Sequence, residues 1–182
     1  MKKLWTILLA GVLVCVIAAC NGGGAAINTD VSVGDFKISL GMEKAQVEEN
    51  LHYIETNPLG MDCYDEGIDI FYRDEKVVCY SIGSDQNDLI SFWGDKGIGD
   101  SAEDMFGDVK PTSEYVSDDG SYKSYSFVMD KSGEILDSTF FEMAAEMSDE
   151  ELKQHTNVSV DIDDGKIERY FVSDMLFARK CK

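Results

Sequence analysis

The chain has 182 residues, of which 44% are hydrophobic and 28% are charged, so it can bury a core and is too apolar for an acidic disordered tail. Its 35 acidic residues outnumber its 16 basic ones, which gives a formal net charge of −19. Because phosphate contacts require clustered Lys and Arg side chains, this charge excludes nucleic acid as an expected partner.

The first twenty residues have the pattern of an export signal that ends on a cysteine. Lys2 and Lys3 precede an uncharged stretch that runs to Val16, and Ile17-Ala18-Ala19-Cys20 closes it. These last four residues resemble the lipobox of bacterial lipoproteins. The resemblance implies that residues 1–19 are a signal peptide and that Cys20 is the lipid-attachment site, on the extracytoplasmic face of the cell membrane. Residues 20–33, with a Gly-rich start, are then a lipidated tether.

A first α+β unit is expected over residues 34–94. Val47, Leu51 and Ile54 recur at the spacing of one apolar helical stripe. Two strands follow, Gly67–Arg73 and Lys76–Ile82, with a two-residue turn between them.

The register of this hairpin predicts which side chains face the core. A turn at Asp74-Glu75 places Ile70 opposite Cys79 and Tyr72 opposite Val77. These four residues and Ile68 are then expected on one buried face. Cys63 precedes Ile70 by seven residues, roughly 23 Å along an extended strand, so a direct Cys63–Cys79 disulfide is not expected.

A second α+β unit is expected over residues 95–182. Ser101 and Asp104 have capping-box-like spacing, and Gly107 would end the short helix that they begin. Composition and turn residues predict three further strands: Tyr122–Met129, Asn157–Asp163 and Lys166–Ser173.

Residues 137–155 read as a helical insertion in the second unit. Ser148 and Glu151 form a capping-box pattern. The apolar residues of the segment either pack the helix onto the sheet or form an adaptable partner-binding surface; they are Phe140, Phe141, Met143 and Met147.

Two short motifs carry a family resemblance. Ile38-Ser39-Leu40-Gly41-Met42, followed by Val47 and Leu51, resembles the helix opening of the β-lactamase-inhibitor-protein-like and small outer-membrane lipoprotein (SmpA/OmlA) domains. Gly97–Ser101 is similar to the start of tandem copies in lipid-anchored proteins of low-GC Gram-positive bacteria. The resemblance implies two copies over residues 34–175, each with a helical pair on a curved antiparallel sheet. It also implies protein binding without a catalytic centre, and names no target.

No residue constellation in the chain points to catalysis or to a cofactor. His52 and His155 are isolated, and neither a nucleophile elbow nor a phosphate-binding loop is present. The best metal candidate is the last hairpin, where a turn at Asp164-Gly165 would place Asp161 opposite Glu168. Calcium would relieve this like-charge pair, but the segment fails the EF-hand pattern, so a solvated surface is favoured over a metal site.

Aromatic side chains are the other candidate for a binding surface. Tyr-rich sheets are common at protein interfaces, although aromatic residues also favour strands for packing alone. The aromatic residues that could line exposed sheet faces are Phe71, Tyr80, Tyr115, Tyr122, Tyr125 and Tyr170.

Together these patterns predict an α+β lipoprotein with two small units in tandem, each with short helices packed on an antiparallel sheet. The function expected first is a non-enzymatic interaction domain with an envelope protein as its partner, held at the membrane by its lipid anchor. The alternative is a solute- or cation-binding envelope protein that uses its acidic surface. Catalytic, cofactor and metal sites are not predicted.

Overall fold

The computed structural model describes residues 27–83, 89–93, 96–103 and 105–180. The predicted signal peptide, Cys20, the first part of the tether and Cys181 lie outside the described residues. Among the helices that the structure describes, none is long and apolar enough to cross a membrane.

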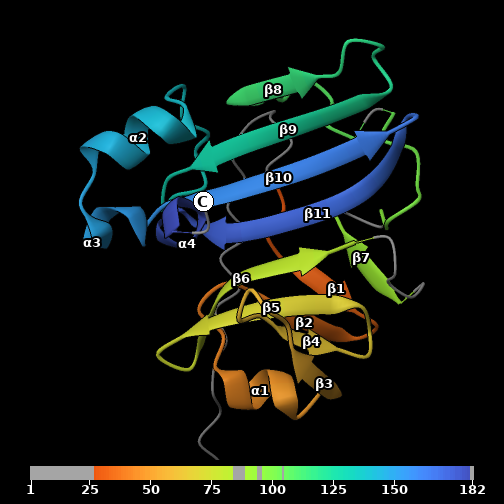
Figure 1. Cartoon of the computed structure of the whole chain (residues 1–182), viewed down its shortest axis with the longest axis vertical. Coiled ribbons are helices and arrows are strands. Elements are labelled where there is room, and N and C mark those ends of the chain that lie inside the picture. Colours follow the sequence, from red (N-terminus) through yellow and green to blue (C-terminus); the bar gives the residue numbers. More distant parts are fainter. Residues whose placement is uncertain (1–26, 84–88, 94–95, 104, 181–182) are drawn as a thin grey trace, which may run out of the picture.

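The main element is an eight-stranded sheet in which every neighbouring pair is antiparallel (Figure 1). It consists of two runs of four consecutive strands, which meet where β6 pairs with β11. In sheet order the strands are β3 (Tyr53–Thr56), β4 (Asp62–Tyr64), β5 (Ile68–Arg73), β6 (Lys76–Ile82), β11 (Lys166–Asp174), β10 (Thr156–Asp163), β9 (Tyr122–Met129) and β8 (Ser113–Val116).

A smaller, three-stranded sheet lies behind the first. Its order is β2 (Phe36–Ile38), β1 (Val31–Val33) and β7 (Ile90–Phe92). The ring of Phe92 stacks on that of Tyr170 in β11 with centroids 4.2 Å apart. Strand β1 lies within residues 20–33, which the sequence analysis assigned to the tether, so the folded body already includes the end of that segment.

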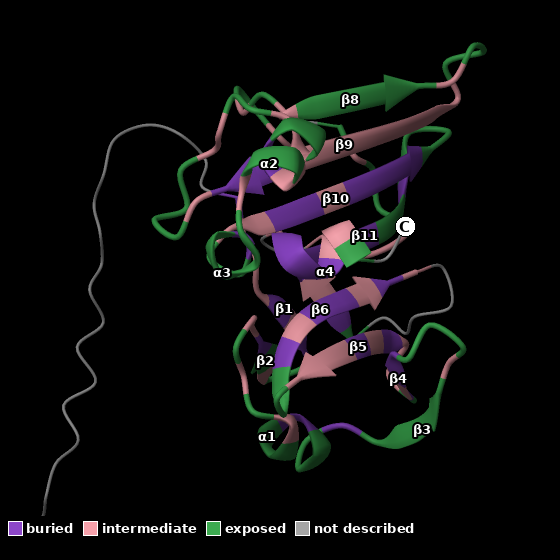
Figure 2. Ribbon diagram, turned by 60° about the vertical axis from the view of Figure 1, so that its left-hand side comes forward, coloured by how far each residue is buried: buried purple, intermediate pink, exposed green. Residues whose placement is uncertain are grey.

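Four short helices complete the α+β fold. Helix α1 (Lys44–Glu48) is joined to β4 by an ion pair between Lys44 and Asp62 at 2.6 Å, whereas α2 (Phe140–Glu146), α3 (Asp149–Leu152) and α4 (Met175–Lys180) stand in front of the large sheet (Figure 2). Helices α2 and α3 thus lie within residues 137–155, where helical structure was predicted. The predicted capping box is also confirmed, because the Ser148 hydroxyl accepts from the Glu151 amide and donates to the Glu151 carboxylate.

Alternation along the strands divides the large sheet into two faces. The core face, toward the small sheet, carries buried side chains from both runs of strands, including Ile70, Val77, Phe127, Val160 and Tyr170. The opposite face, here called the helix face, is covered in part by α2, α3 and α4. Buried side chains there form a smaller cluster of Val128, Met143, Leu152, Met175 and Leu176.

The β5–β6 hairpin confirms the predicted strands and turn but not the whole register. Asp74 and Glu75 have φ of 52° and 60°, as the expected two-residue turn requires, and Tyr72 lies opposite Val77. A β-bulge then shifts the pairing, so that Phe71, not Ile70, is opposite Cys79. The prediction of Cys79 on the core face is therefore wrong.

Two helical predictions also fail. Residue Ile54 belongs to the exposed edge strand β3 and is 54% exposed, so the apolar stripe ends at Leu51. The segment that begins at Ser101 forms turns and no helix in its described residues; Asp104 lies outside them. There the Ser101 hydroxyl accepts from the Glu103 amide, a local turn that competes with a helix start.

Candidate functional site: a groove on the helix face

A groove of about 750 Å³ lies on the helix face, between the β3–β4 turn and α4. We call it the α4 groove. Hollows of about 470 and 490 Å³ lie elsewhere and both include acidic residues in their linings, whereas the lining of the α4 groove has none. Its lining consists of Pro58, Leu59, Met61, Ser159, Arg169, Phe171, Phe177, Ala178 and Lys180.

The floor of the groove follows from strand alternation. Tyr170 and Val172 are fully buried on the core face, so Phe171 between them must point to the helix face. Across the ladder Phe171 lies opposite Ser159 of β10, whose hydroxyl is 3.0 Å from that of Ser126. The floor therefore places an aromatic ring beside hydrogen-bonded hydroxyl groups.

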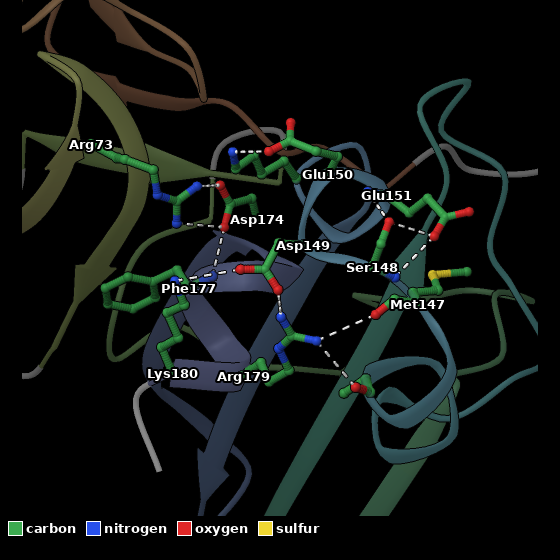
Figure 3. A network of polar contacts seen from close by, with 12 residues as sticks. Arg73, Met147, Ser148, Asp149, Glu150, Glu151, Asp174, Phe177, Arg179 and Lys180 are labelled. Carbon is green, nitrogen blue, oxygen red and sulfur yellow. Dashed lines mark hydrogen bonds and ion pairs between the residues drawn. The ribbon is translucent and has the colours of Figure 1, made fainter.

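Helix α4 forms one wall, and Asp174 holds its first turn. The Asp174 carboxylate accepts from the Phe177 amide at 2.7 Å, which is an N-terminal cap, and from Arg73 Nη1 at 2.6 Å (Figure 3). Arg73 comes from β5, so this ion pair joins the first run of strands to α4. The ion pair thereby positions the ring of Phe177. The centroid of this ring lies 4.8 Å from that of Phe71 and 6.3 Å from that of Phe171.

The far end of α4 is held by the helical insertion. Arg179 donates to the main-chain oxygens of Ala144 and Met147 at the end of α2 and pairs with Asp149 at the start of α3 (Figure 3). An arginine fork suits this role because its donors lie in one fixed plane. The insertion thus serves as a support for α4.

The opposite wall is the turn between β3 and β4. The Asn57 side-chain oxygen accepts from the amides of Leu59 and Met61, an Asx-type turn that ends in Gly60 at φ +79°. This local bonding holds Leu59 away from the core, and its side chain is 77% exposed. Tyr53 and Ile54 of β3 are also exposed, but they lie outside the groove lining.

Two cations line the groove. Lys180 is 63% exposed, and its nearest described carboxylate, that of Asp149, is 3.7 Å away. The Arg169 side chain is 55% exposed while its Nη2 lies 2.5 Å from the buried carboxylate of Asp161. The Asp161 carboxylate also accepts a hydrogen bond from the Ser124 hydroxyl at 2.7 Å. This second contact orients the carboxylate, which in turn orients the Arg169 guanidinium.

The pair Asp161–Arg169 corrects a prediction. The turn at Asp164-Gly165 is present, but a bulge between Asp161 and Ile162 shifts the ladder by one residue, so Asp161 faces Arg169 and not Glu168. The like-charge pair that suggested calcium is therefore an ion pair. Within the described ranges, no group of three or more His, Cys, Asp and Glu residues is arranged to hold a metal ion.

The predicted aromatic surface is found only in part. Tyr80 and Tyr170 are fully buried on the core face, which matches the alternative of strand packing, whereas Tyr115 on the edge strand β8 is 61% exposed. The remaining three are partly buried: Phe71, Tyr122 and Tyr125. In the insertion Met143 packs in the helix-face cluster and Phe141 is 69% exposed.

Among the described residues, the cysteines and histidines do not meet at one site. Cys63 is partly buried and Cys79 is fully buried. Desolvation and the neighbouring Asp69 carboxylate raise the pKa of Cys63 to about 11, which disfavours the reactive thiolate. His155 Nδ1 lies 2.8 Å from the Glu151 main-chain oxygen, at the end of α3.

Sequence reasoning missed most of the groove. The Asn57-Pro58 dipeptide followed by Leu59-Gly60 is a turn signal that carries an apolar residue, and it could have drawn attention to Leu59. Helix α4 gave a weaker signal, because Met175-Leu176-Phe177 continues directly from a strand. Comparisons with protein-family models, with curated proteins and with solved structures give no match to this chain.

Proposed function

We propose that this protein is a lipid-anchored extracytoplasmic lipoprotein that binds a protein partner in the α4 groove without catalysing a reaction. The observation that carries the proposal is the exposure of Leu59 at 77% beside the aromatic floor of the groove. Exposed apolar surface of this kind, rimmed by polar side chains, is typical of interaction sites.

The sheet architecture supports the same proposal. Each half of the large sheet is a run of four consecutive antiparallel strands, which is compatible with two α+β units in tandem. Under this interpretation the two units fuse through β6 and β11 into one broad sheet face, and a site on that face combines residues from both. The α4 groove does so, with Leu59 from the first unit and Phe171 from the second.

Membrane attachment rests on the sequence. The proposed diacylglycerol at Cys20 would hold the body near the membrane, since residues 21–26 form only a short link. Cys20→Ala should move the protein from the membrane fraction to the soluble fraction of the envelope. An unchanged membrane fraction would contradict lipid attachment.

The binding function is tested by crosslinking the native protein in its membranes, followed by affinity capture and mass spectrometry. We expect one reproducible envelope partner that is lost with Leu59→Ser, a change that removes apolar area without adding charge. Leu89→Ser is the matched control, because Leu89 is 62% exposed and lies beside β7, outside the groove lining. Equal capture by both variants would overturn the assignment of the groove.

Binding of a cation or a solute by the acidic surface is the competing proposal, and the net charge of −19 is its only support. The pairing of Asp161 with Arg169 makes the last hairpin a poor cation site. We expect millimolar calcium to leave the melting temperature unchanged. A saturable increase would favour the competing proposal.

A further inference from the structure

The α4 groove differs in charge from the molecule that carries it. The whole chain has 35 acidic and 16 basic residues, yet the groove lining contains Arg169 and Lys180 and no Asp or Glu. Arg169 and Lys180 each have one carboxylate neighbour, Asp161 at 2.5 Å and Asp149 at 3.7 Å, but both side chains are more than half exposed and keep N–H donors for a second acceptor.

The two cations are also separated in the fold. Arg169 projects from β11 and is fixed by Asp161, whereas Lys180 projects from the last turn of α4. Apolar groups of the lining are supplied by Leu59, Phe171 and Phe177. An occupant that matches this arrangement carries a carboxylate and a large apolar group close together.

From this complementarity we propose that the α4 groove binds an extended segment of a partner protein in which an acidic side chain lies next to a large apolar one. The inference rests on the proposed function and specifies the chemistry of the partner. The volume of about 750 Å³ is enough for several side chains of such a segment. The apolar side chain packs on Phe171 and Phe177, and the carboxylate pairs with Arg169 or Lys180.

A protein segment fits better than a membrane surface. A bilayer with anionic headgroups would face the whole acidic body, which repels it, whereas a narrow peptide meets mainly the groove, since screening limits charge effects to about 8 Å at physiological salt. The hydroxyl groups of the floor, such as that of Ser159, suit the polar backbone of a peptide.

The test is a selection from a phage-displayed library of random peptides against the full lipidated protein in phosphatidylcholine nanodiscs. We expect the selected peptides to be enriched in Asp or Glu beside Leu, Phe or Trp, relative to the starting library. Affinity of the best peptide should fall about tenfold in Lys180→Glu and remain unchanged in Lys37→Glu. Lys37 is the matched control because it is 67% exposed on β2, in the other layer.

Several results would overturn the inference. The inference would be overturned if the selected peptides were not enriched in acidic residues, or if they bound Lys180→Glu as tightly as the unmodified protein. Either result would show that Arg169 and Lys180 do not determine which peptide binds. If no peptide is selected, laurate binding that Leu59→Ser abolishes would assign the groove to a small amphipathic anion, and dimerisation of the protein that Leu59→Ser abolishes would assign it to a second copy.

The variants also separate this inference from the proposed function. If the peptides no longer bind Leu59→Ser but bind Lys180→Glu normally, the groove remains the interaction site and the proposed preference for acidic segments is wrong. Peptides that bind both variants equally would reject both proposals. Circular dichroism and urea unfolding of each variant would confirm that it is folded.

Discussion

The two faces of the large sheet use alternate residues of the same strands but differ in how they are covered. On the core face, Ile70, Tyr170 and their neighbours are fully buried against the small sheet. On the helix face, the same strands carry Phe71 and Phe171, which only short helices cover, and the groove stays open beside α4. The comparison suggests a division of roles in which the core face supplies stability and the helix face carries the proposed binding site.

The arrangement has a physical cause. A sheet packed against a second sheet buries long rows of side chains at once, whereas a helix of six residues such as α4 covers only a few. The helices of the helix face are therefore held by a small apolar cluster together with polar contacts, of which those of Asp174 and Arg179 are the principal ones. Three predictions test this division.

The largest expected effect is on the core face. Ile70→Ala should lower the free energy of unfolding by about 3–4 kcal/mol, because it removes buried methyl groups and leaves a cavity among fully packed neighbours. Urea denaturation followed by circular dichroism measures this change. Leu59→Ser provides the comparison on the helix face, with an expected change within about 0.5 kcal/mol. Equal losses in the two variants would contradict the division between faces.

An intermediate effect is expected at the support of α4. Asp174→Ala should cost about 2–3 kcal/mol, because it removes the helix cap and leaves Arg73 without its carboxylate. Asp174→Asn keeps a capping oxygen and loses the charge, so it should cost less. Both variants should also weaken partner binding, since Phe177 would no longer be held. Unfolding curves and affinity capture test the two parts, and an Asp174→Ala protein of normal stability and binding would refute the supporting role.

The smallest effect concerns thiol chemistry on the helix face. Cys63 is partly buried with a pKa near 11, against 9.0 for an ordinary thiol, so its thiolate fraction at pH 8 should be about 100-fold lower. In a Cys181→Ser background, alkylation by iodoacetamide should accelerate up to about pH 11. Asp69→Asn should shift this profile to lower pH, and Cys79 should react only on unfolding. A Cys63 profile that levels off near pH 9 would show that the site is not desolvated.

Local signals predicted several elements well. Strand Tyr122–Met129, the turns at Asp74-Glu75 and Asp164-Gly165, and the cap at Ser148 all match the structure, because each depends on residues within a few positions of one another. The bulges beside Phe71 and Asp161 were not predictable in this way. A bulge shifts the pairing with the partner strand by one residue, and the alternation of residues within a single strand does not predict where this shift occurs.

The candidate site shows the same limit more strongly. Its residues come from the β3–β4 turn and, about 100 positions later in the chain, from two strands and helix α4. Each of them has an ordinary local context, and Leu59 in particular reads only as an apolar residue in a turn. These residues come to line one groove only because β6 pairs with β11 and joins the two runs of strands into one sheet.

The sequence by itself determined the α+β class, the net charge of −19, most strands and turns of the second half, and a pattern that predicts export and lipid attachment at Cys20. Only the tertiary structure decided which face each aromatic residue occupies, the pairing of Asp161 with Arg169, and the groove beside α4. The reason is the range of the interactions involved. Turns, caps and charge depend on neighbours in the chain, whereas register across bulges and the walls of a groove depend on contacts between distant segments.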